Sequence, residues 1–134
     1  MFELRANGVN PKTEGGKIAQ RLVYICSPYR ASPTRTVAQN VDLAQRLCHA
    51  ALDDGFVPFA PHLFFTRFLD EENEKERASG IAAALRFLGV MDQVWVFDHC
   101  GISEGMRLEI AKAADFGLPV FYRPAAWRNI WPNG

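Results

Sequence analysis

Short apolar runs alternate with longer amphipathic segments along this chain. Strands are predicted where the runs are short and rich in β-branched or aromatic residues, at 21–26, 56–60, 94–97 and 120–122. Apolar residues recur at helical spacing over 37–52, over 81–91 and after Ser103. Strands that alternate with helices are typical of a mainly parallel sheet covered by helices. The pattern therefore predicts a single α/β domain, Rossmann-like (flavodoxin-like), with about four to five strands.

The segment from Asp92 to Gly117 is the most informative part of the sequence. Its apolar run fits a strand buried on both faces, and the polar turn that follows leads to Ser103, a favourable helix N-cap. Gly117, followed by leucine and proline, predicts the end of that helix. Ligands of open α/β sheets bind beyond the carboxyl ends of the strands, where a helix amino terminus attracts anions. Glu109 lies on this helix beside its apolar face, and its carboxylate is the first candidate for chemistry.

Length and charge limit the classes of protein that this chain can represent. Its 134 residues suffice for one domain with a core, over 21–134, and residues 1–20 are predicted to be a flexible arm because they hold Asn-Gly, Asn-Pro and Gly-Gly pairs. The 15 basic and 15 acidic residues balance, which argues against binding to nucleic acid or to an anionic membrane. The apolar runs are too short for a membrane span or a signal peptide, so a cytoplasmic location is expected.

Cysteine and histidine pairs raise the alternative of a zinc site. The three cysteines are Cys26, Cys48 and Cys100, an odd number without CxxC spacing, which predicts no disulfide framework. Two of them adjoin a histidine, at 48–49 and 99–100, but adjacent residues rarely bind one metal ion together. Buried reduced thiols are therefore the favoured interpretation, and we expect neither a metal nor a cofactor.

Three strand ends should meet at one edge of the predicted sheet, at 24–30, 60–62 and 98–109. The phenylalanine-rich segment 64–69 is predicted to form either a helical turn or a mobile cover over a pocket. The acidic run 70–77 is predicted to be either a solvated loop or a helix start. Near the end of the sequence, three apolar residues fit either the core or a subunit contact, with the core favoured: Trp127, Ile130 and Trp131.

Motifs at these strand ends resemble the nucleoside 2-deoxyribosyltransferase superfamily. They are VYICSPYR at 23–30, APH at 60–62 and SEGMRLEIAKAADFGLPV at 103–120, and the similarity covers about 21 to 122. The SPYR and ISEGM patterns are most similar to those of a bacterial and phage branch. The Ser-x-Gly-x-x-x-Glu spacing is also that of the glycosidase that cleaves 2'-deoxynucleoside 5'-monophosphates. The resemblance implies a nucleoside or nucleotide as the small-molecule partner, and a homodimer or larger homo-oligomer.

The resemblance also implies a chemical mechanism. Glu109 matches the family nucleophile, which attacks the anomeric carbon of a 2-deoxyribosyl group and forms a covalent glycosyl ester. Water or a second base then resolves the ester, so the protein would be a hydrolase or a transferase acting on N-glycosidic bonds. Tyr24 matches the family tyrosine, whose hydroxyl hydrogen-bonds the glutamate and fixes its rotamer. The dipole and N–H groups near a helix start are expected to keep Glu109 ionised at neutral pH.

Substrate-binding positions are predicted around this pair. They are Ser27, Arg30, His62, Asp98, Ser103, Gly105 and Met106. Ser103 and the N–H groups of Gly105 and Met106 match the phosphate cradle of the monophosphate-cleaving branch. The arginine matches a basic residue that pairs the same phosphate, and the histidine occupies a position near the sugar.

One position departs from the family pattern. Members of the superfamily carry an aspartate on the helix before the third strand, where it hydrogen-bonds the sugar and assists proton transfer to the base; the matching residue here is Ala84. Asp98 and Glu104 are the acidic residues that could replace it, although neither matches the motif. Loss of a general acid lowers a rate by roughly 10²–10⁴. A second hypothesis therefore stays open, a non-catalytic sensor that binds a nucleotide or nucleotide sugar at the same edge.

Each candidate residue also has an interpretation that needs no ligand. Glu109 could pair with Lys112 on the helix surface, and Ser103 is a good N-cap whether or not a phosphate binds. Tyr24 alternates with apolar neighbours and fits the core, and His62 is as well explained as a structural histidine. A structure decides between these interpretations, because they place the side chains differently.

Overall fold

The computed structural model describes residues 21–130, and these form a four-stranded sheet with helices on both faces. The strands are β1 (Leu22–Cys26), β2 (Val57–Phe59), β3 (Gln93–Val96) and β4 (Val120–Tyr122), and the helices are α1 (Val37–Asp53), α2 (Glu74–Phe87) and α3 (Glu104–Asp115). All strand pairs are parallel, in the order β2-β1-β3-β4. The predicted fold class is confirmed. The predicted arm over 1–20 and Trp131 lie outside the described residues.

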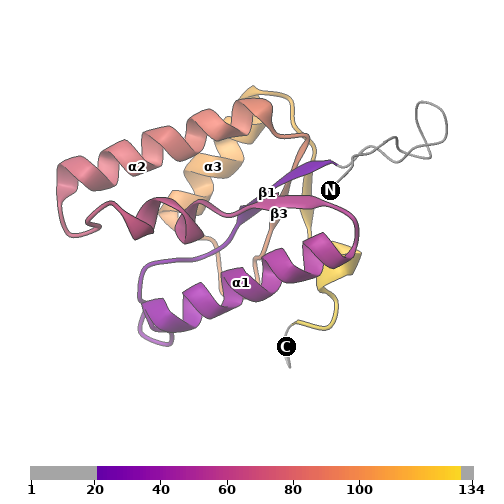
Figure 1. Ribbon diagram of the computed structural model, residues 1–134, viewed down its shortest axis with the longest axis horizontal. Helices are drawn as coiled ribbons and strands as arrows, with labels where there is room; N and C mark the ends of the chain where they lie inside the picture. The colour runs from indigo at the N-terminus through magenta and orange to yellow at the C-terminus, as the bar shows by residue number, and fades with distance from the viewer. Residues whose placement is uncertain (1–20, 131–134) are drawn as a thin grey trace.

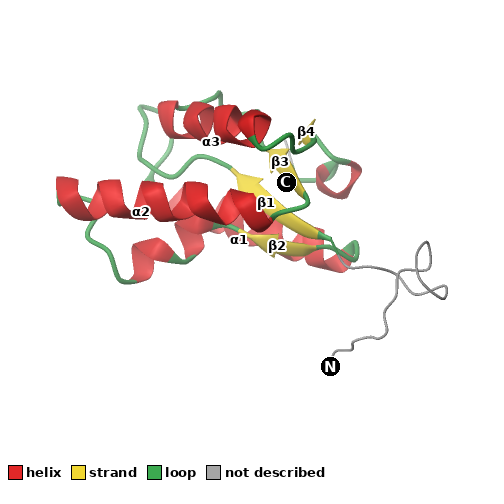
Figure 2. Cartoon of the chain, turned by 90° about the horizontal axis from the view of Figure 1, so that it is seen from above, coloured by secondary structure: helices red, strands yellow, loops and turns green. Residues whose placement is uncertain are grey.

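The helices divide the protein into two cores, one on each face of the sheet. α1 lies on one face, whereas α2 and α3 lie on the other (Figure 1, Figure 2). Successive side chains of a strand point to opposite faces, so β1 serves both cores. Val23 and Ile25 pack on the α1 side, and Tyr24 and Cys26 pack on the α3 side. Burial on both faces explains the continuous apolar run of β1 and β3.

Local hydrogen bonds fix the starts and ends of the helices. Thr36 caps α1 in a capping box with Gln39, each side chain bonding the backbone N–H of the other residue. Ser103 caps α3, because its hydroxyl accepts from the N–H of Met106 at 3.2 Å. Gly117 follows α3 with a φ of 72°, a left-handed conformation that glycine adopts without strain. The predicted start and end of α3 are thus confirmed.

α2 begins earlier than the apolar pattern predicts. Its N-cap is Asn73, and its first turn takes Glu74 and Glu76 from the acidic run, which is therefore part turn and part helix. Acidic side chains are favourable in the first turn of a helix because they lie near the positive end of the helix dipole. The predicted last turn is replaced by a 3-10 turn over Leu88–Val90. Periodicity missed the first turns because they carry solvent-facing charges.

β2 is an edge strand that contains Pro58. Val57 donates its N–H to the carbonyl of Arg21 at 2.9 Å, so the nitrogen of the next residue faces away from β1. Proline is tolerated at this position because no neighbouring strand needs its missing N–H. The edge position of β2 therefore explains why this three-residue strand can contain a proline.

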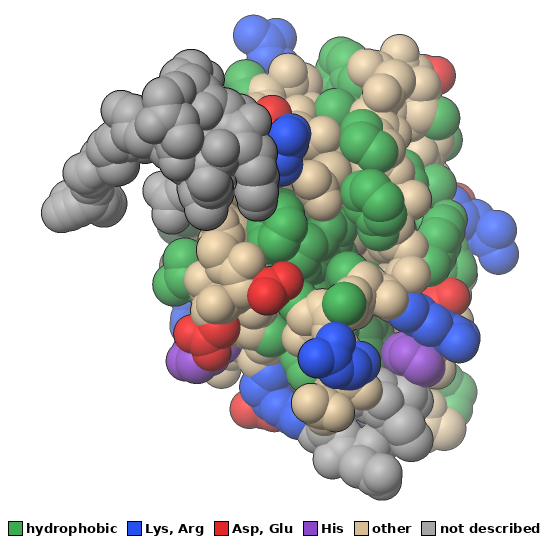
Figure 3. Space-filling model, turned by 90° about the vertical axis from the view of Figure 1, so that its right-hand side faces the viewer, with side chains coloured by type: hydrophobic (Ala, Val, Ile, Leu, Met, Phe, Trp, Pro, Cys, Tyr) green, Lys and Arg blue, Asp and Glu red, His purple; other side chains and the backbone are tan. Residues whose placement is uncertain are grey.

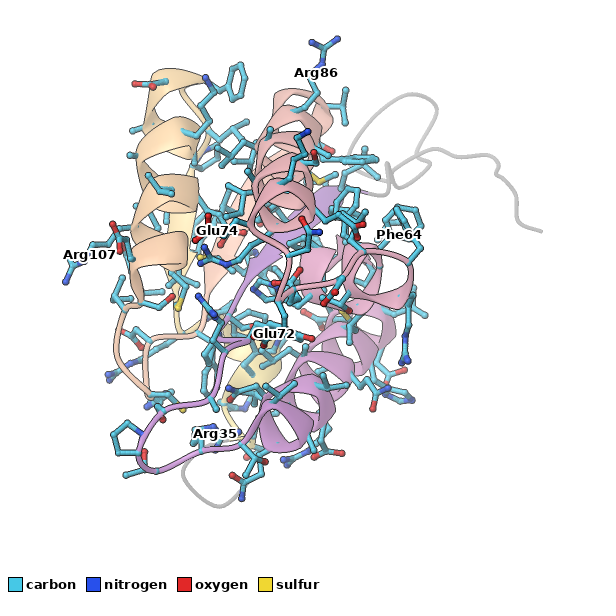
Figure 4. The ribbon with its side chains drawn as sticks, turned by 90° about the vertical axis from the view of Figure 1, so that its left-hand side faces the viewer. Arg35, Phe64, Glu72, Glu74, Arg86 and Arg107 are labelled. Carbon is cyan, nitrogen blue, oxygen red and sulfur yellow. The ribbon has the colours of Figure 1, made fainter. Side chains whose placement is uncertain are left out.

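The phenylalanine-rich segment after β2 forms 3-10 helices at Pro61–Leu63 and Phe65–Arg67. The helical-turn interpretation of this segment is confirmed. Phe65 is buried, whereas Phe64 and Phe68 are 48% and 61% exposed, and their rings contact each other at 5.4 Å between centroids. Phe64 lies on the outer side of the segment in Figure 4. This cluster places exposed aromatic surface beside the carboxyl ends of the strands.

The last described residues belong to the core. Trp127 is 3% exposed and donates its indole N–H to the carbonyl of Leu47 at 3.0 Å, and Ile130 is also buried. The core interpretation of these two residues is confirmed over a subunit contact. The view in Figure 3, toward the end of the sheet where the strands begin, shows exposed hydrophobic side chains with both signs of charge around them. The polar strand ends lie at the opposite end of the molecule.

Candidate active site

A cavity of about 490 Å³ opens at the carboxyl ends of the strands. Its walls come from the loops after β1, β2 and β3, from α2, and from the start of α3, as the topology of an open α/β sheet predicts. Figure 4 looks at this end of the molecule, where the starts of the three helices come together. Predicted site residues from all three strand ends line it: Arg30, His62, Ser103, Gly105, Met106 and Glu109.

Glu109 projects from α3 into the wall of this cavity and contacts β1. The carboxylate is 7% exposed, so the surface interpretation with Lys112 is wrong. The Tyr24 hydroxyl donates to Oε2 at 2.6 Å, and the Cys26 thiol donates to Oε1 at 3.2 Å. The two donors meet Glu109 together because they are two residues apart on one face of β1, over which α3 packs. The pairing of Tyr24 with Glu109 is the one the sequence motifs imply.

Burial raises the pKa of Glu109 to about 7, and the hydrogen bonds from Tyr24 and Cys26 oppose this increase. The helix start therefore does not keep the pKa of Glu109 low, and the carboxyl group is only partly ionised at neutral pH. The residue is the sixth of α3, beyond the first turn in which the dipole acts, and its donors are side chains rather than N–H groups. Burial, with the charge of Glu109, also raises the pKa of Tyr24 and of Cys26. Both groups thus remain protonated donors at neutral pH.

His62 lines the cavity from the segment that follows β2. Burial lowers its pKa to about 4, although a hydrogen bond to the backbone of Ser27 opposes the change. Its ring stacks on Tyr29, with 5.0 Å between centroids and 26° between planes. The imidazole is therefore neutral at pH 7, and this pair offers a flat surface and a neutral polar edge to a ligand.

The amino terminus of α3 forms another wall. The Ser103 hydroxyl accepts from Met106 N–H, which leaves its own O–H available as a donor. A Cβ at Gly105 would have only the Ser103 oxygen within reach, at 4.0 Å, so packing inside the protein does not require glycine there. A ligand that approaches the backbone closely would require it.

Basic and acidic side chains that sequence reasoning missed also line the cavity. They are Arg35, Glu71 and Arg77. Asn40 is buried and orders the loop after β1, because its amide donates to the carbonyls of Tyr29 and Arg30 at 3.0 and 3.1 Å, while Arg35 donates to its oxygen at 2.7 Å. Arg77 is seven residues before Ala84, which puts both on one face of α2. That helical spacing was the available signal.

Two predicted positions, Asp98 and Ser27, do not line the cavity, whereas Ala84 does. Asp98 does not line the cavity and instead pairs with Arg123 at 3.0 Å. Ser27 is 1% exposed, and its hydroxyl has no hydrogen-bond partner among residues 21–130. Ala84 is 6% exposed and lies in the cavity wall, where α2 presents a methyl group. Glu104, the other possible replacement, does line the cavity.

The fold and the position of the cavity define an α/β protein of the flavodoxin-like class. A 2-deoxyribosyltransferase from the psychrotolerant bacterium Bacillus psychrosaccharolyticus has a similar structure, with a TM-score of 0.59 and 16% sequence identity, covering 75% of this chain and 70% of that one. At this identity the likeness concerns the fold.

The sequence itself assigns the chain more narrowly. It belongs to the family described as Domain of unknown function (DUF7768), whose sequence profile matches residues 21–123. A comparison with curated proteins finds no match. Across the described residues, no helix is long and apolar enough to cross a membrane, and no group of three or more His, Cys, Asp or Glu side chains could hold a metal ion.

Proposed function

We propose that this protein cleaves the N-glycosidic bond of a nucleoside or a nucleoside 5'-monophosphate through a covalent intermediate on Glu109. The observation that carries the proposal is the position of this carboxylate, buried in the wall of a 490 Å³ cavity and held by Tyr24 at 2.6 Å. A retaining glycosyl reaction needs a carboxylate that is fixed, shielded from water and close to a sugar-sized space. The shared fold with a 2-deoxyribosyltransferase supports the same chemistry.

The reaction takes place in two displacements. A carboxylate oxygen of Glu109 bonds to the anomeric carbon while the bond to the base breaks, and the base leaves with the electron pair. Water or a second base then attacks the same carbon and releases Glu109, which distinguishes a hydrolase from a transferase. A pKa of about 7 leaves a substantial ionised fraction at neutral pH, and that fraction is a better nucleophile than a strongly acidic carboxylate.

Although Glu71 and Glu104 also line the cavity, two arginines and a helix start provide groups that suit a substrate phosphate. Arg30 and Arg77 enter from the loop after β1 and from α2, and the amino terminus of α3 adds N–H groups and positive dipole. A guanidinium can bind phosphate through two parallel hydrogen bonds. The stacked pair of Tyr29 and His62 offers a surface for the base or the sugar. A nucleoside 5'-monophosphate fits this distribution better than a neutral nucleoside.

The test is trapping of the intermediate. The protein is incubated with 2-fluoro-2-deoxyribosyl donors, as nucleosides and as 5'-monophosphates, and its intact mass and peptide map are measured. We expect an added fluorosugar on the peptide that contains Glu109, no adduct in Glu109→Gln, and an unchanged adduct in Asp115→Asn, an exposed acid at the end of the same helix. A folded wild-type protein that gives no adduct and cleaves none of the common nucleosides or nucleotides would refute the proposal.

One observation favours a second function, binding without cleavage. Ala84 leaves α2 without a carboxyl group at the cavity wall, so the base would depart without the proton that the superfamily aspartate assists. In that case calorimetry should detect nucleotide binding that persists in Glu109→Gln and is lost in Arg30→Ala. Turnover of any nucleotide by the wild-type protein would exclude this alternative.

We also propose that the protein assembles as a homodimer. Phe64 and Phe68 are exposed beside the cavity, and exposed aromatic clusters mark contact surfaces. Analytical ultracentrifugation of the wild type and of Phe64→Ser/Phe68→Ser should show a dimer and a monomer respectively. A monomeric wild type at micromolar concentration would contradict the proposal.

A further inference from the structure

Glu109 receives a different donor on each carboxylate oxygen. Tyr24 donates its O–H to Oε2 at 2.6 Å, and Cys26 donates its S–H to Oε1 at 3.2 Å. Both donors come from β1, and both are completely buried. A phenol makes a strong hydrogen bond to a carboxylate, whereas a thiol is a weak donor. The two oxygens are therefore electronically different before any substrate binds.

We infer that Cys26 is a positioning residue which, together with Tyr24, makes Oε1 of Glu109 the oxygen that attacks the sugar. This inference rests on the proposed function. The strong bond from Tyr24 draws electron density from Oε2 and fixes the orientation of the carboxylate plane. The weak bond from Cys26 holds Oε1 in place but leaves most of its electron density available to an electrophilic carbon.

The same arrangement suits the covalent intermediate. When a lone pair of Oε1 forms a bond to the anomeric carbon, the bond from that carbon to the base breaks. The base departs with the electron pair of the broken bond and takes a proton from water. Oε2 becomes the carbonyl oxygen of the ester and continues to accept from Tyr24. Oε1 becomes a poor acceptor, and the thiol keeps its proton and has the carbonyl of Met106 at 3.8 Å as a second acceptor. In the second displacement water or a second base bonds to the anomeric carbon, the ester bond breaks, and the electron pair of that bond returns to Oε1.

The other charged and titratable groups of the cavity come from different elements. The loops after the strands contribute Tyr29, Arg30, Arg35, His62 and Cys100, α2 and the turn before it contribute Arg77 and Glu71, and α3 contributes Glu104. The hydrogen bonds that described residues make to the Glu109 side chain come from β1 alone. Changes at Cys26 should therefore act on Glu109 directly, through Oε1.

The test compares Cys26→Ala, which removes the donor, with Cys26→Ser, which replaces it by a stronger one. Loss of the donor should raise the pKa of Glu109, and the hydroxyl should lower it. Cleavage at neutral pH should fall about threefold to tenfold in the alanine variant, from loss of a weak hydrogen bond. In the serine variant the rate at high pH should fall, because Oε1 becomes less nucleophilic. Cys48→Ala, a change to a half-buried cysteine in the other core, is the matched control.

Two readouts separate this inference from the proposed function. Carbon-13 NMR of glutamate-labelled protein gives the pKa of Glu109 without substrate, with Glu109→Gln for assignment, and the pH dependence of cleavage gives its effect on rate. The expected result is a higher pKa of Glu109 in Cys26→Ala and a lower one in Cys26→Ser, each with the change in cleavage rate given above. Equal pKa values in wild type, Cys26→Ala and Cys26→Ser would overturn the inference even if the enzyme is active. Should the alanine variant fail to fold, the direction of the serine shift decides. Opposite shifts without any cleavage by wild type would instead refute the proposed function, and with it the role of Oε1.

Discussion

Tyr24 and Glu109 are 85 positions apart in the sequence and are joined by a buried hydrogen bond of 2.6 Å. One comes from a central strand and the other from the helix that packs on it, so the bond forms only when the sheet and α3 are assembled. A charge-assisted hydrogen bond between buried groups is stronger than one at the surface. The tyrosine therefore both orients the carboxylate and sets how readily it ionises.

Removal of this hydroxyl should weaken the site without changing its shape. In Tyr24→Phe the ring stays in place, the pKa of Glu109 rises above about 7, and cleavage at neutral pH falls by about tenfold to hundredfold. The measurement is the rate of nucleotide cleavage as a function of pH. Tyr122→Phe, on exposed β4, is the control and should leave the profile unchanged. A profile that is identical in Tyr24→Phe and wild type would contradict this role.

Burial of Glu109 should make the protein less stable as the pH rises. Its pKa is raised from 4.5 to about 7, so the folded state holds this proton more tightly than the unfolded chain does. The stability that protonation confers is complete below about pH 4.5 and is lost as the pH rises through about 7, with a total of about 3 kcal/mol at 1.36 kcal/mol per pKa unit.

Glu109→Gln removes this titration and provides the measurement. Its free energy of unfolding in urea, relative to wild type, should increase by about 3 kcal/mol between about pH 4.5 and pH 8. Asp115→Asn, with an exposed carboxylate on the same helix, should show no such slope. A difference that stays constant over this pH range would mean that Glu109 ionises in the folded protein as it does in water.

Arg30 should discriminate between nucleotides and nucleosides. A guanidinium–phosphate pair is a charge-assisted contact, so Arg30→Ala should weaken binding of a nucleoside 5'-monophosphate by about tenfold to hundredfold and leave the nucleoside unaffected. Calorimetric titration with both ligands is the measurement. Arg107 points outward from α3 in Figure 4 and is the control. Equal losses for nucleotide and nucleoside would show that Arg30 acts on the loop rather than on phosphate.

Ala84 should be a position where activity can be gained. In Ala84→Asp a carboxyl group enters the wall of the cavity and can donate a proton to the departing base, which should raise the rate of cleavage by about tenfold or more. In its ionised form the new carboxylate should also raise the pKa of Glu109, because like charges disfavour ionisation, and so shift the pH profile upward. The comparison is with Ala84→Asn, which has nearly the same size. If both variants have the same rate, proton donation from α2 does not limit the reaction.

The sequence predicted the pairing at the centre of the site and not its electrostatics. The motifs predicted that Tyr24 and Glu109 lie at one edge of the sheet, because β1 and α3 have recognisable strand and helix patterns. The ionisation of Glu109 depends on how completely α3 covers it, which is a property of packing. Cys26 was interpreted as a packing residue, since its contact with Oε1 follows from strand alternation only once the partner helix is known.

Regular patterns explain which parts of the fold could be anticipated. The strands and α1 were predicted closely because most of their apolar runs are continuous, and Ser103 supplied the cap signal for α3. The start of α2 was missed because it has charges where the pattern needs apolar residues. Arg77 was not predicted to line the cavity because it lies in this charged first part of α2. Asp98 was expected in the site because it follows β3, but Arg123 is close enough to pair with it.

Pro58 restricts how copies of this protein can associate. The outward side of β2 lacks a backbone donor at the middle of a three-residue strand, so another β-strand cannot extend the sheet there in regular register. Continuous intermolecular sheets, including fibrillar ones, are therefore disfavoured along this border. Any oligomer that forms on this side has to rely on side-chain packing, and the nearby phenylalanines provide the surface for it.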